Sequence, residues 1–335
     1  MKLGILMDFS GWYNNYKKAC EELGVEYEII DLISDNWINN IRKSNCDGYL
    51  VRPNFQKQVW KDMDDEKLFF IEKILNKKIY PNFLECFIYE NKKNMSYWLE
   101  INNIKHPKTH VFYKKEEAIK FFETAKYPLV FKPNIGSAAN GILFLNNSKQ
   151  AKKLTKRIFT KLKFVNFGYT KWIKTRYGFC YPQMDDKQYN FMIVQEKLDV
   201  KCEWRMIKIG ESYFGHQKLE KNGFHSGSGL VGWVKPPIEL LNMTKKICEL
   251  GKFSSMDIDI FETRTGEYYV NELQTIFGSY NQSQMYINDI PGRFRNIDGE
   301  WIFEKGYFNK NASCNLRVED FVNQLNKKGE TNVKK

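Results

Sequence analysis

A hairpin in the C-terminal half of the chain constrains the fold more than any other segment. The run MDIDIFETRTGEYYVNELQTIFG, residues 256–278, holds two alternating segments on either side of a Thr-Gly turn, which predicts two antiparallel strands. Residues i and i+2 of a strand share a face, so Glu272 and Gln274 project together and the hairpin can bring Asp259 opposite them. Two carboxylates and an amide oxygen suit Mg²⁺, which takes its other ligands from water and phosphate. By itself the segment is also consistent with an ordinary hairpin that has acidic residues on its solvent face.

A second segment places a lysine before a loop of small residues. The apolar run 127–133 contains Lys132, and the loop NIGSAANG that follows contains Gly136 and Ser137 before a new strand at 142–145. Backbone N–H groups of such a loop can contact phosphate oxygens, and the lysine adds a point charge. The pattern differs from the strand–loop–helix phosphate loop, because a strand follows and the lysine precedes the glycines. Taken alone, such a loop is more often a simple turn.

A third segment predicts further strands between these two. FMIVQEKL, residues 191–198, reads as one strand, and 203–210 with 213–219 read as a strand pair that turns at Gly210. Each strand is ordinary by itself. The order of the three segments along the chain carries the information.

That order resembles the ATP-grasp superfamily, and within it the ribosomal-protein glutamate ligases, glutathione synthetases and D-alanine–D-alanine ligases. The similarity covers residues 80–280. Its motifs, in chain order, are Lys132 with the loop that follows it, Gln195-Glu196 at a strand end, Glu203-x-Arg205, and Asp259 with Glu272-x-Gln274. In that family a further phosphate-binding lysine precedes the lid. Asn91-Lys92, followed by Trp-Leu and then Pro107-Lys108-Thr109, matches its segment, and Lys93 is the alternative if the register shifts by one.

The resemblance implies an α/β (α+β) fold, with a small parallel α/β domain followed by the two-lobed ATP-grasp fold. The expected division is 1–90 for the N-terminal domain, 91–190 for the lid-bearing lobe, 191–310 for the lobe with the metal ligands, and 311–335 for a C-terminal helix and tail. It also implies an ATP-dependent ligase that forms an amide through an acylphosphate. The expected substrates are an amino acid and a peptide, glycan precursor or natural-product intermediate, and the expected cofactors are ATP and two Mg²⁺ ions, with Mn²⁺ as a substitute.

The resemblance further implies a role for each residue of the site. Phosphates would be bound by Lys92, Lys132, Gly136 and Ser137; adenine and ribose by Gln195, Glu196, Lys197, Leu198 and Glu203; the transferred phosphoryl and the acyl oxyanion by Arg205 and Lys218; and metal by Asp259, Glu272 and Gln274.

The chain departs from the family pattern in three places. Gln274 stands where the family usually has Asn, Ala138 and Ala139 make the loop poorer in glycine, and Phe277-Gly278 replaces the usual Pro-Gly after the hairpin. These departures keep two alternatives open. One is a phosphotransferase that stops after phosphoryl transfer, and the other is a nucleotide- or nucleic-acid-binding protein without catalysis.

Composition narrows the compartment and the partners. The net charge is +12, but the lysines are spread along predicted helices, which favours a solvated basic surface over an anionic acceptor, and both over nucleic acid. Seven cysteines without a CxxC pair predict reduced thiols of a cytoplasmic protein. No run reaches the ~18 apolar residues of a membrane span, and the start of the chain does not read as a secretory signal. Because many proteins of the family are dimers, a homodimer is an open alternative.

Two further regions bear on the substrate. Residues 1–80 alternate strands (3–7, 26–32, 48–52, 78–81) and helices (13–23, 36–44, 62–76), which predicts a parallel sheet with ligands at its carboxyl edge. Arg52 stands at that edge, either to hold a substrate carboxylate or as a surface arginine beside a turn proline. The segment 160–189 mixes basic and aromatic residues. It reads either as an element that packs over a lobe or as a surface for an anionic acceptor.

Overall fold

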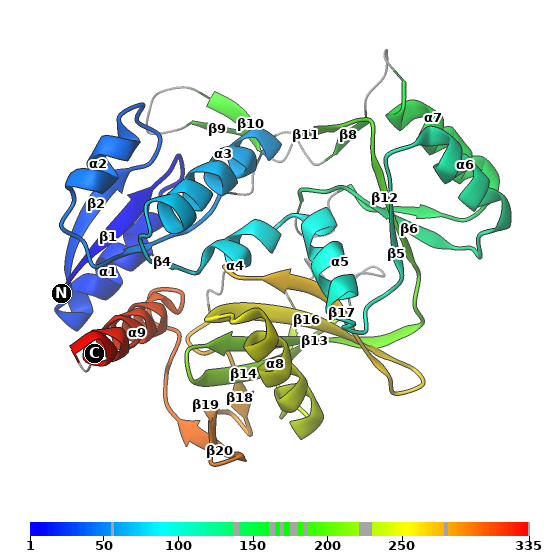
Figure 1. Ribbon diagram of the computed structural model, residues 1–335. Coiled ribbons are helices and arrows are strands. Elements are labelled where there is room, and N and C mark those ends of the chain that lie inside the picture. Colours follow the sequence, from blue (N-terminus) through cyan, green and yellow to red (C-terminus); the bar gives the residue numbers. More distant parts are fainter. Residues whose placement is uncertain are drawn as a thin grey trace.

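Figure 1 presents the chain, a computed structural model, as a parallel sheet at the N-terminus, a four-stranded antiparallel sheet on the opposite side and a large antiparallel sheet below them. The four-stranded antiparallel sheet is the one predicted to bear the lid, and it is named the lid-bearing sheet for that reason. Two helices, α4 (Phe83–Ile88) and α5 (Lys92–Ile101), lie at the centre between the three. The structure describes residues 1–54, 57–136, 141–160, 165–167, 171–174, 180–183, 186–220, 230–277 and 281–333. For those of them that fall within 161–187 and 328–335, it describes the backbone only.

The N-terminal domain confirms the predicted alternation of strands and helices. Its sheet has the order β2-β1-β3-β4 with every pairing parallel. The strands are β1 (Lys2–Met7), β2 (Glu26–Asp31), β3 (Gly48–Leu50) and β4 (Ile79–Tyr80), and the helices are α1 (Tyr13–Leu23), α2 (Trp37–Lys43) and α3 (Gln58–Phe69), which continues into the π-helix η1 (Phe70–Ile74). Gly24 ends α1 in the left-handed region, at φ 64°, where glycine carries no Cβ penalty. The carboxyl edge of this sheet carries Asp8 and Arg52.

The central helices are fixed at their first turns by asparagine side chains. Asn82 accepts a hydrogen bond from the backbone N–H of Glu85, whose carboxylate accepts one in return, so α4 begins with a capping box. Asn91 caps α5 by accepting from the N–H of Asn94. The Asn91 cap fixes the start of α5 and thereby the position of Lys92, its first residue.

The lid-bearing lobe is an antiparallel sheet of order β5-β12-β6-β7 with two helices on one face. Its core joins Phe122 and Leu154 of the helices to Phe131 and Val194 of the strands. Its elements are β5 (Thr109–Phe112), α6 (Lys115–Thr124), β6 (Leu129–Lys132), β7 (Leu143–Leu145), α7 (Ser148–Ile158) and β12 (Met192–Glu196). The predicted strand–loop–strand around Lys132 is therefore confirmed, and the strand ending in Gln-Glu lies in the same sheet as β6.

The segment between α7 and β12 forms two short antiparallel ladders. β9 (Lys171–Lys174) pairs with β10 (Cys180–Gln183), and β8 (Val165–Phe167) pairs with β11 (Asp186–Gln188). Both ladders lie along the top of the view in Figure 1, β9–β10 above α3 and β8–β11 between α3 and the lid-bearing lobe.

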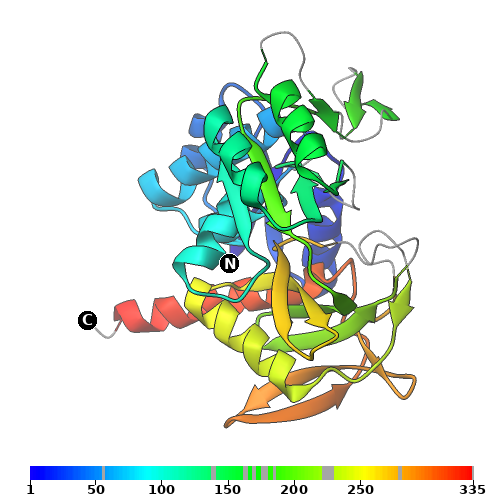
Figure 2. The same cartoon turned by 90° about the vertical axis from the view of Figure 1, so that its right-hand side faces the viewer.

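The large sheet has the order β17-β16-β13-β14-β19-β18, and two further strands pair with members of this path, β15 with β14 and β20 with β19. Alternation along β13 puts Trp204 and Met206 in the core that α8 shares, while Glu203 and Arg205 lie on the opposite face, where they contact Lys218 and Asp259. Figure 2 shows α8 covering one face of this sheet. The elements are β13 (Val200–Ile209), β14 (Ser212–Lys218), β15 (Val231–Gly232), α8 (Ile238–Gly251), β16 (Ser255–Thr263), β17 (Tyr268–Gln274), β18 (Tyr286–Ile287), β19 (Ile290–Ile297) and β20 (Glu300–Lys305).

The last helix returns to the N-terminal domain. α9 (Cys314–Val333) lies beside α1, and its Val318 and Phe321 share one core with Leu3 and Ile5. The N-terminal sheet and the C-terminal helix therefore pack together in one hydrophobic core. No helix of the described residues combines the length and the apolar character needed to cross a bilayer.

Candidate active site

The hairpin of β16 and β17 forms as predicted and brings the acidic residues together. Asp259 pairs with Glu272 across the antiparallel ladder, and Asp257 pairs with Gln274. The turn is closed at Gly266, whose φ is 80°. One face of the hairpin therefore carries both carboxylates predicted to bind metal, with Gln274 beside them.

A bulge in this hairpin adds Asn271 to the same face. Ile260 pairs with Val270, so one extra residue lies in β17 between Val270 and Glu272. The side chain of Asn271 donates to Glu203 Oε1 at 3.1 Å and accepts from Lys132 Nζ at 3.0 Å. Regular strand alternation would place Asn271 on the face opposite Glu272, so the sequence pattern does not indicate Asn271 as a site residue.

Asp259 is held by two cations from neighbouring strands. Arg205 donates to both carboxylate oxygens, at 3.1 and 3.2 Å, and Lys218 Nζ donates at 2.7 Å. Burial alone would raise the pKa of Asp259, but the two cations outweigh it and lower the pKa to about 2. Lys218 also bonds Glu203 Oε1 at 3.1 Å, and burial raises the pKa of that glutamate.

Asp257 and His216 extend this face further. Asp257 is fully buried, and its carboxylate lies 2.9 Å from Arg205 Nε without hydrogen-bond geometry to any described residue. Burial raises its pKa well above the usual range, against the opposing charge of Arg205. His216 Nδ1 lies 2.8 Å from the carbonyl of Gln284, and burial together with Arg205 lowers the pKa of His216 to about 4. His216 is therefore a neutral imidazole at pH 7 whose Nδ1 donates to that carbonyl.

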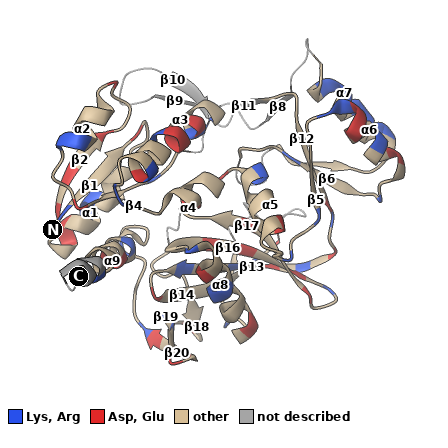
Figure 3. Ribbon diagram, in the orientation of Figure 1, with Lys and Arg blue, Asp and Glu red and all other residues tan. Residues whose placement is uncertain are grey.

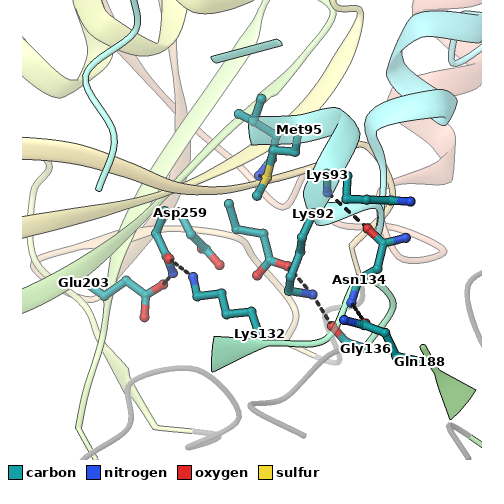
Figure 4. Close-up of polar contacts among 12 residues, drawn as sticks. Lys92, Lys93, Met95, Lys132, Asn134, Gly136, Gln188, Glu203 and Asp259 are labelled. Carbon is teal, nitrogen blue, oxygen red and sulfur yellow. Dashed lines mark hydrogen bonds and ion pairs between the residues drawn. The ribbon is translucent and has the colours of Figure 1, made fainter. Parts of the chain in front are cut away.

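Two lysines, Lys92 of α5 and Lys132 of β6, approach this face of the hairpin (Figure 4). Lys92 Nζ donates to the carbonyl of Gly136 at 2.6 Å and lies 3.9 Å from Glu272 Oε1. Lys132 is partly buried, and burial lowers its pKa to about 8, with the charge of Lys92 acting in the same direction. The ammonium of Lys93 instead lies 4.1 Å from the ring centroid of Phe191, so Lys92 is the one that faces the site.

Glu90 and Lys92 both contact Gly136, the first glycine of the small-residue loop. The backbone N–H of Gly136 donates to the carboxylate of Glu90, while its carbonyl accepts from Lys92. Glu90 is buried in the left-handed region, at φ 50°, and burial raises its pKa to about 8. Ser137, predicted to bind phosphate, lies outside the described residues.

The residues predicted to bind adenine lie at the end of β12. Gln195 is buried, donates to Thr109 Oγ1 at 3.0 Å and lines a small cavity that Lys92, Lys132 and Asn271 also line. Glu196 and Lys197 are exposed and Leu198 is half-buried. The backbone N–H of Glu196 is already bonded to the carbonyl of Lys108.

The donor set can be tested for Mg²⁺. Asp259 is ionised but already neutralised by Arg205 and Lys218, whereas Glu272 is partly buried and has only Lys92 as an ion-pair partner among the described residues. Among the described residues, no group of three or more His, Cys, Asp or Glu side chains is arranged to bind a metal ion by itself. Because Mg²⁺ is commonly held by one or two carboxylates and substrate phosphates, Glu272, Asp259 and the Gln274 amide fit an ion bound together with a nucleotide.

Comparisons with known proteins agree with this arrangement at the level of the fold. A comparison with models of protein families found no match, and a comparison with curated proteins found none either. A D-alanine–D-alanine ligase from Bacillus anthracis superposes with a TM-score of 0.55 and 15% identity, covering 85% of this chain and 89% of that one. A RimK-domain ATP-grasp protein from Sphaerobacter thermophilus gives 0.52 and 12%, over 82% and 90%. An N5-carboxyaminoimidazole synthetase from Staphylococcus aureus, solved with ADP, gives 0.55 and 12%, over 88% and 81%. The chain has the ATP-grasp fold.

Proposed function

We propose that the protein is an ATP-dependent carboxylate–amine ligase. One arrangement carries the proposal: Lys92 and Lys132 contact Glu272 and Asn271 of the hairpin, beside an Asp259 held by Arg205 and Lys218. Buried cations and carboxylates of this kind are costly unless a ligand uses them. A nucleotide triphosphate is the ligand whose charge and shape match both sides.

Lys92 and Lys132 are proposed to bind the phosphates. Their present hydrogen-bond partners are the carbonyl of Gly136 and the amide oxygen of Asn271, which are neutral acceptors, and Glu272 lies 3.9 Å from the ammonium of Lys92. Phosphate oxygens would supply the negative charge that the desolvated ammonium of Lys132 lacks. Glu90 and Lys92 together fix Gly136, so the loop that follows would start from a defined position.

Arg205 and Lys218 are proposed to stabilise the reacting groups. An acid substrate would attack the γ-phosphate to give an acylphosphate, and an amine would then displace phosphate to form the amide. Negative charge develops on the phosphoryl and acyl oxygens in both steps, and preorganised cations stabilise it. When bound, Mg²⁺ would neutralise charge on the β- and γ-phosphates. Asp259, Glu272 and Gln274 are proposed to hold it.

The proposed acid and amine are an amino acid and a peptide, glycan precursor or natural-product intermediate, joined in the cytoplasm. ADP release measured with acid alone, amine alone and both together tests the proposal. A ligase needs both, a phosphotransferase releases ADP with one acceptor, and a non-catalytic nucleotide-binding protein releases none. Lys132→Ala should abolish the signal, while Lys126→Ala, which removes an exposed lysine of the same lobe, should leave it unchanged.

A further inference from the structure

Arg52 follows β3, a central strand of the N-terminal sheet, and lies just beyond its carboxyl end. It has no anionic partner among the described residues. Its guanidinium carbon is 4.0 Å from the ring centroid of Trp12, a cation–π contact. The side chain is only partly exposed. Within the described residues it forms neither a hydrogen bond nor an ion pair, so all of its N–H groups remain free for a ligand.

A second arginine adds positive charge near it. Arg317 of α9 is fully buried, and its Nε and Nη1 donate to two neutral oxygens, Ser255 Oγ at 3.0 Å and the carbonyl of Ala312 at 2.9 Å. Its Nη2 has no hydrogen-bond partner, and no carboxylate of the described chain lies within ion-pair distance. Because neutral acceptors do not cancel a charge, Arg317 leaves a net positive potential inside the protein.

The two arginines lie in the same region, because Val318, next to Arg317 on α9, shares a buried core with Leu50, two residues before Arg52. Burial lowers the pKa of Arg52, and the charge of Arg317 lowers it further. Both arginines also act on the buried Tyr89, whose pKa is raised by burial and then by the charges of Glu90 and Glu272. Tyr89 is therefore within electrostatic reach of the arginines on one hand and of Glu272 on the other.

A packing contact ties this region to the segment that follows the hairpin. The guanidinium carbon of Arg317 lies 4.8 Å from the ring centroid of Phe277, three residues after Gln274. Figure 1 shows α9 and the N-terminal sheet on the side of the central helices opposite the lid-bearing lobe. The arginines thus lie away from Lys132 of the lid-bearing sheet.

We propose that Arg52 anchors an anionic group of one substrate, a carboxylate or a phosphate, at the edge of the N-terminal sheet, and that the nearby buried charge of Arg317 strengthens this site. The inference rests on the proposed function, since it assigns the anchored anion to the acid or the amine of the ligation. A guanidinium is suited to this role because its fork makes two parallel hydrogen bonds to one carboxylate or phosphate. Arg317 acts through its charge, since its unpartnered Nη2 is buried.

The test uses two small anions, succinate and inorganic phosphate, as probes. Each is titrated against the full chain in thermal melts with saturating Mg²⁺–ADP, so that phosphate cannot occupy the site of Lys92 and Lys132. A ligand that binds the folded state raises the melting temperature in a saturable way. We expect such a rise for wild type with at least one probe, and the probe that acts identifies the anion as carboxylate or phosphate.

Variants separate Arg52 from the other cations. Arg52→Ala should abolish the rise, and Arg52→Lys, which keeps the charge but loses the fork, should weaken the apparent affinity about tenfold. Arg42→Ala is the matched control, because it removes an exposed arginine of the same domain, and it should respond as wild type does. Circular dichroism checks that each variant is folded; if Arg52→Ala is not, Arg52→Lys decides.

The proposal is overturned if neither probe stabilises wild type, or if the Arg52 variants respond to the probes as wild type does. Its failure can be distinguished from failure of the proposed function. Binding of ADP, measured by calorimetry, should be unchanged in Arg52→Ala. If wild type does not bind ADP, the proposed function fails, and the anion titration is then repeated in the Lys132→Ala background, where the result still decides the role of Arg52.

Discussion

Lys132 of the lid-bearing sheet donates a 3.0 Å hydrogen bond to Asn271 of the hairpin, so the two lobes meet at the residue next to Glu272. The amide of Asn271 also donates a hydrogen bond to Glu203, and Glu203 accepts another from Lys218. The chain of contacts links a proposed phosphate-binding lysine to the residues around Asp259 (Figure 4). An unpaired ammonium would be costly at this partly buried position, and Asn271 reduces that cost without neutralising the charge that phosphate needs.

Replacing Asn271 should weaken ATP binding. Asn271→Ala removes the acceptor of Lys132 and a donor to Glu203, both charged partners, and such hydrogen bonds contribute about 1.5–3 kcal/mol each. We expect the KM for ATP to rise about tenfold or more, with a smaller change in the melting temperature. Asn146→Ala, an exposed asparagine of the lid-bearing lobe, is the control and should change neither. An unaltered KM in Asn271→Ala would show that the contact plays no part in nucleotide binding.

Affinity for ATP should depend on pH through Lys132. Burial lowers the pKa of Lys132 to about 8, so the lysine loses its charge as the pH rises through that value. A bound triphosphate favours the charged form, and binding above pH 8 should therefore take up a proton. Calorimetry in buffers of different ionisation enthalpy would measure the uptake, and the Kd for ATP should increase between pH 7 and 9.5.

Lys132→Arg provides the control for this pH dependence. Arginine stays protonated across the whole range, so its Kd should be nearly constant from pH 7 to 9.5. A wild-type Kd that does not change over the same range would contradict the assignment of Lys132 to the phosphates.

Glu272→Gln should remove activity and leave the fold intact. The side chain lies at a partly exposed position and belongs to no apolar core, so its loss should not affect packing. Loss of one Mg²⁺ carboxylate should lower turnover about 100-fold or more at low millimolar Mg²⁺. Glu267→Gln, at the turn of the same hairpin, should keep full activity, because Glu267 contacts Lys105 at the surface. Near-normal turnover in Glu272→Gln would exclude the metal assignment.

Glu85 should make the stability depend on pH. It is fully buried and accepts from the backbone N–H groups of Ser254 and Ser255, which ties α4 to the start of β16. Burial raises its pKa from the ordinary 4.5 to about 7 in the folded protein, although those N–H groups oppose the shift. The folded state therefore binds more protons than the unfolded chain between these values. This contribution to stability is complete below about pH 4.5 and is lost as the pH rises through 7.

Glu85→Gln should remove that contribution and cost stability as well. Glutamine cannot accept from the N–H of Asn82 with its amide nitrogen, so we expect a loss of about 1–3 kcal/mol. The difference in unfolding free energy between wild type and variant, from urea titrations at pH 5, 6, 7 and 8, should shrink as the pH rises. A constant difference would mean that Glu85 does not titrate in this range.

The basic surface also follows from local sequence. Lys149, Lys152, Lys153, Lys156 and Arg157 all lie on α7, and Figure 3 shows this helix as the densest basic element of the lid-bearing lobe. Other lysines are distributed over many helices and strands, as the sequence predicted. A solvated basic surface stays a prediction for this charge.

Sequence alone determined the features that depend on neighbours along the chain. Alternation and the Thr-Gly turn were enough to predict the hairpin and the pairing of Asp259 with Glu272, and the strand–helix alternation of residues 1–80 was enough for the parallel sheet. In both cases a short connection leaves few ways to pair the strands. The order of the motifs then identified the fold.

Only the tertiary structure decided the contacts that depend on register between distant strands. A one-residue bulge turned Asn271 into the site, and the pairing of β13 with β16 placed Arg205 against Asp259 rather than in an exposed ion pair. The return of α9 brought Arg317 into the region of Arg52, 265 residues earlier in the chain. Neither a bulge nor a long-range packing contact changes local hydrophobic periodicity, so no pattern in the sequence reports it.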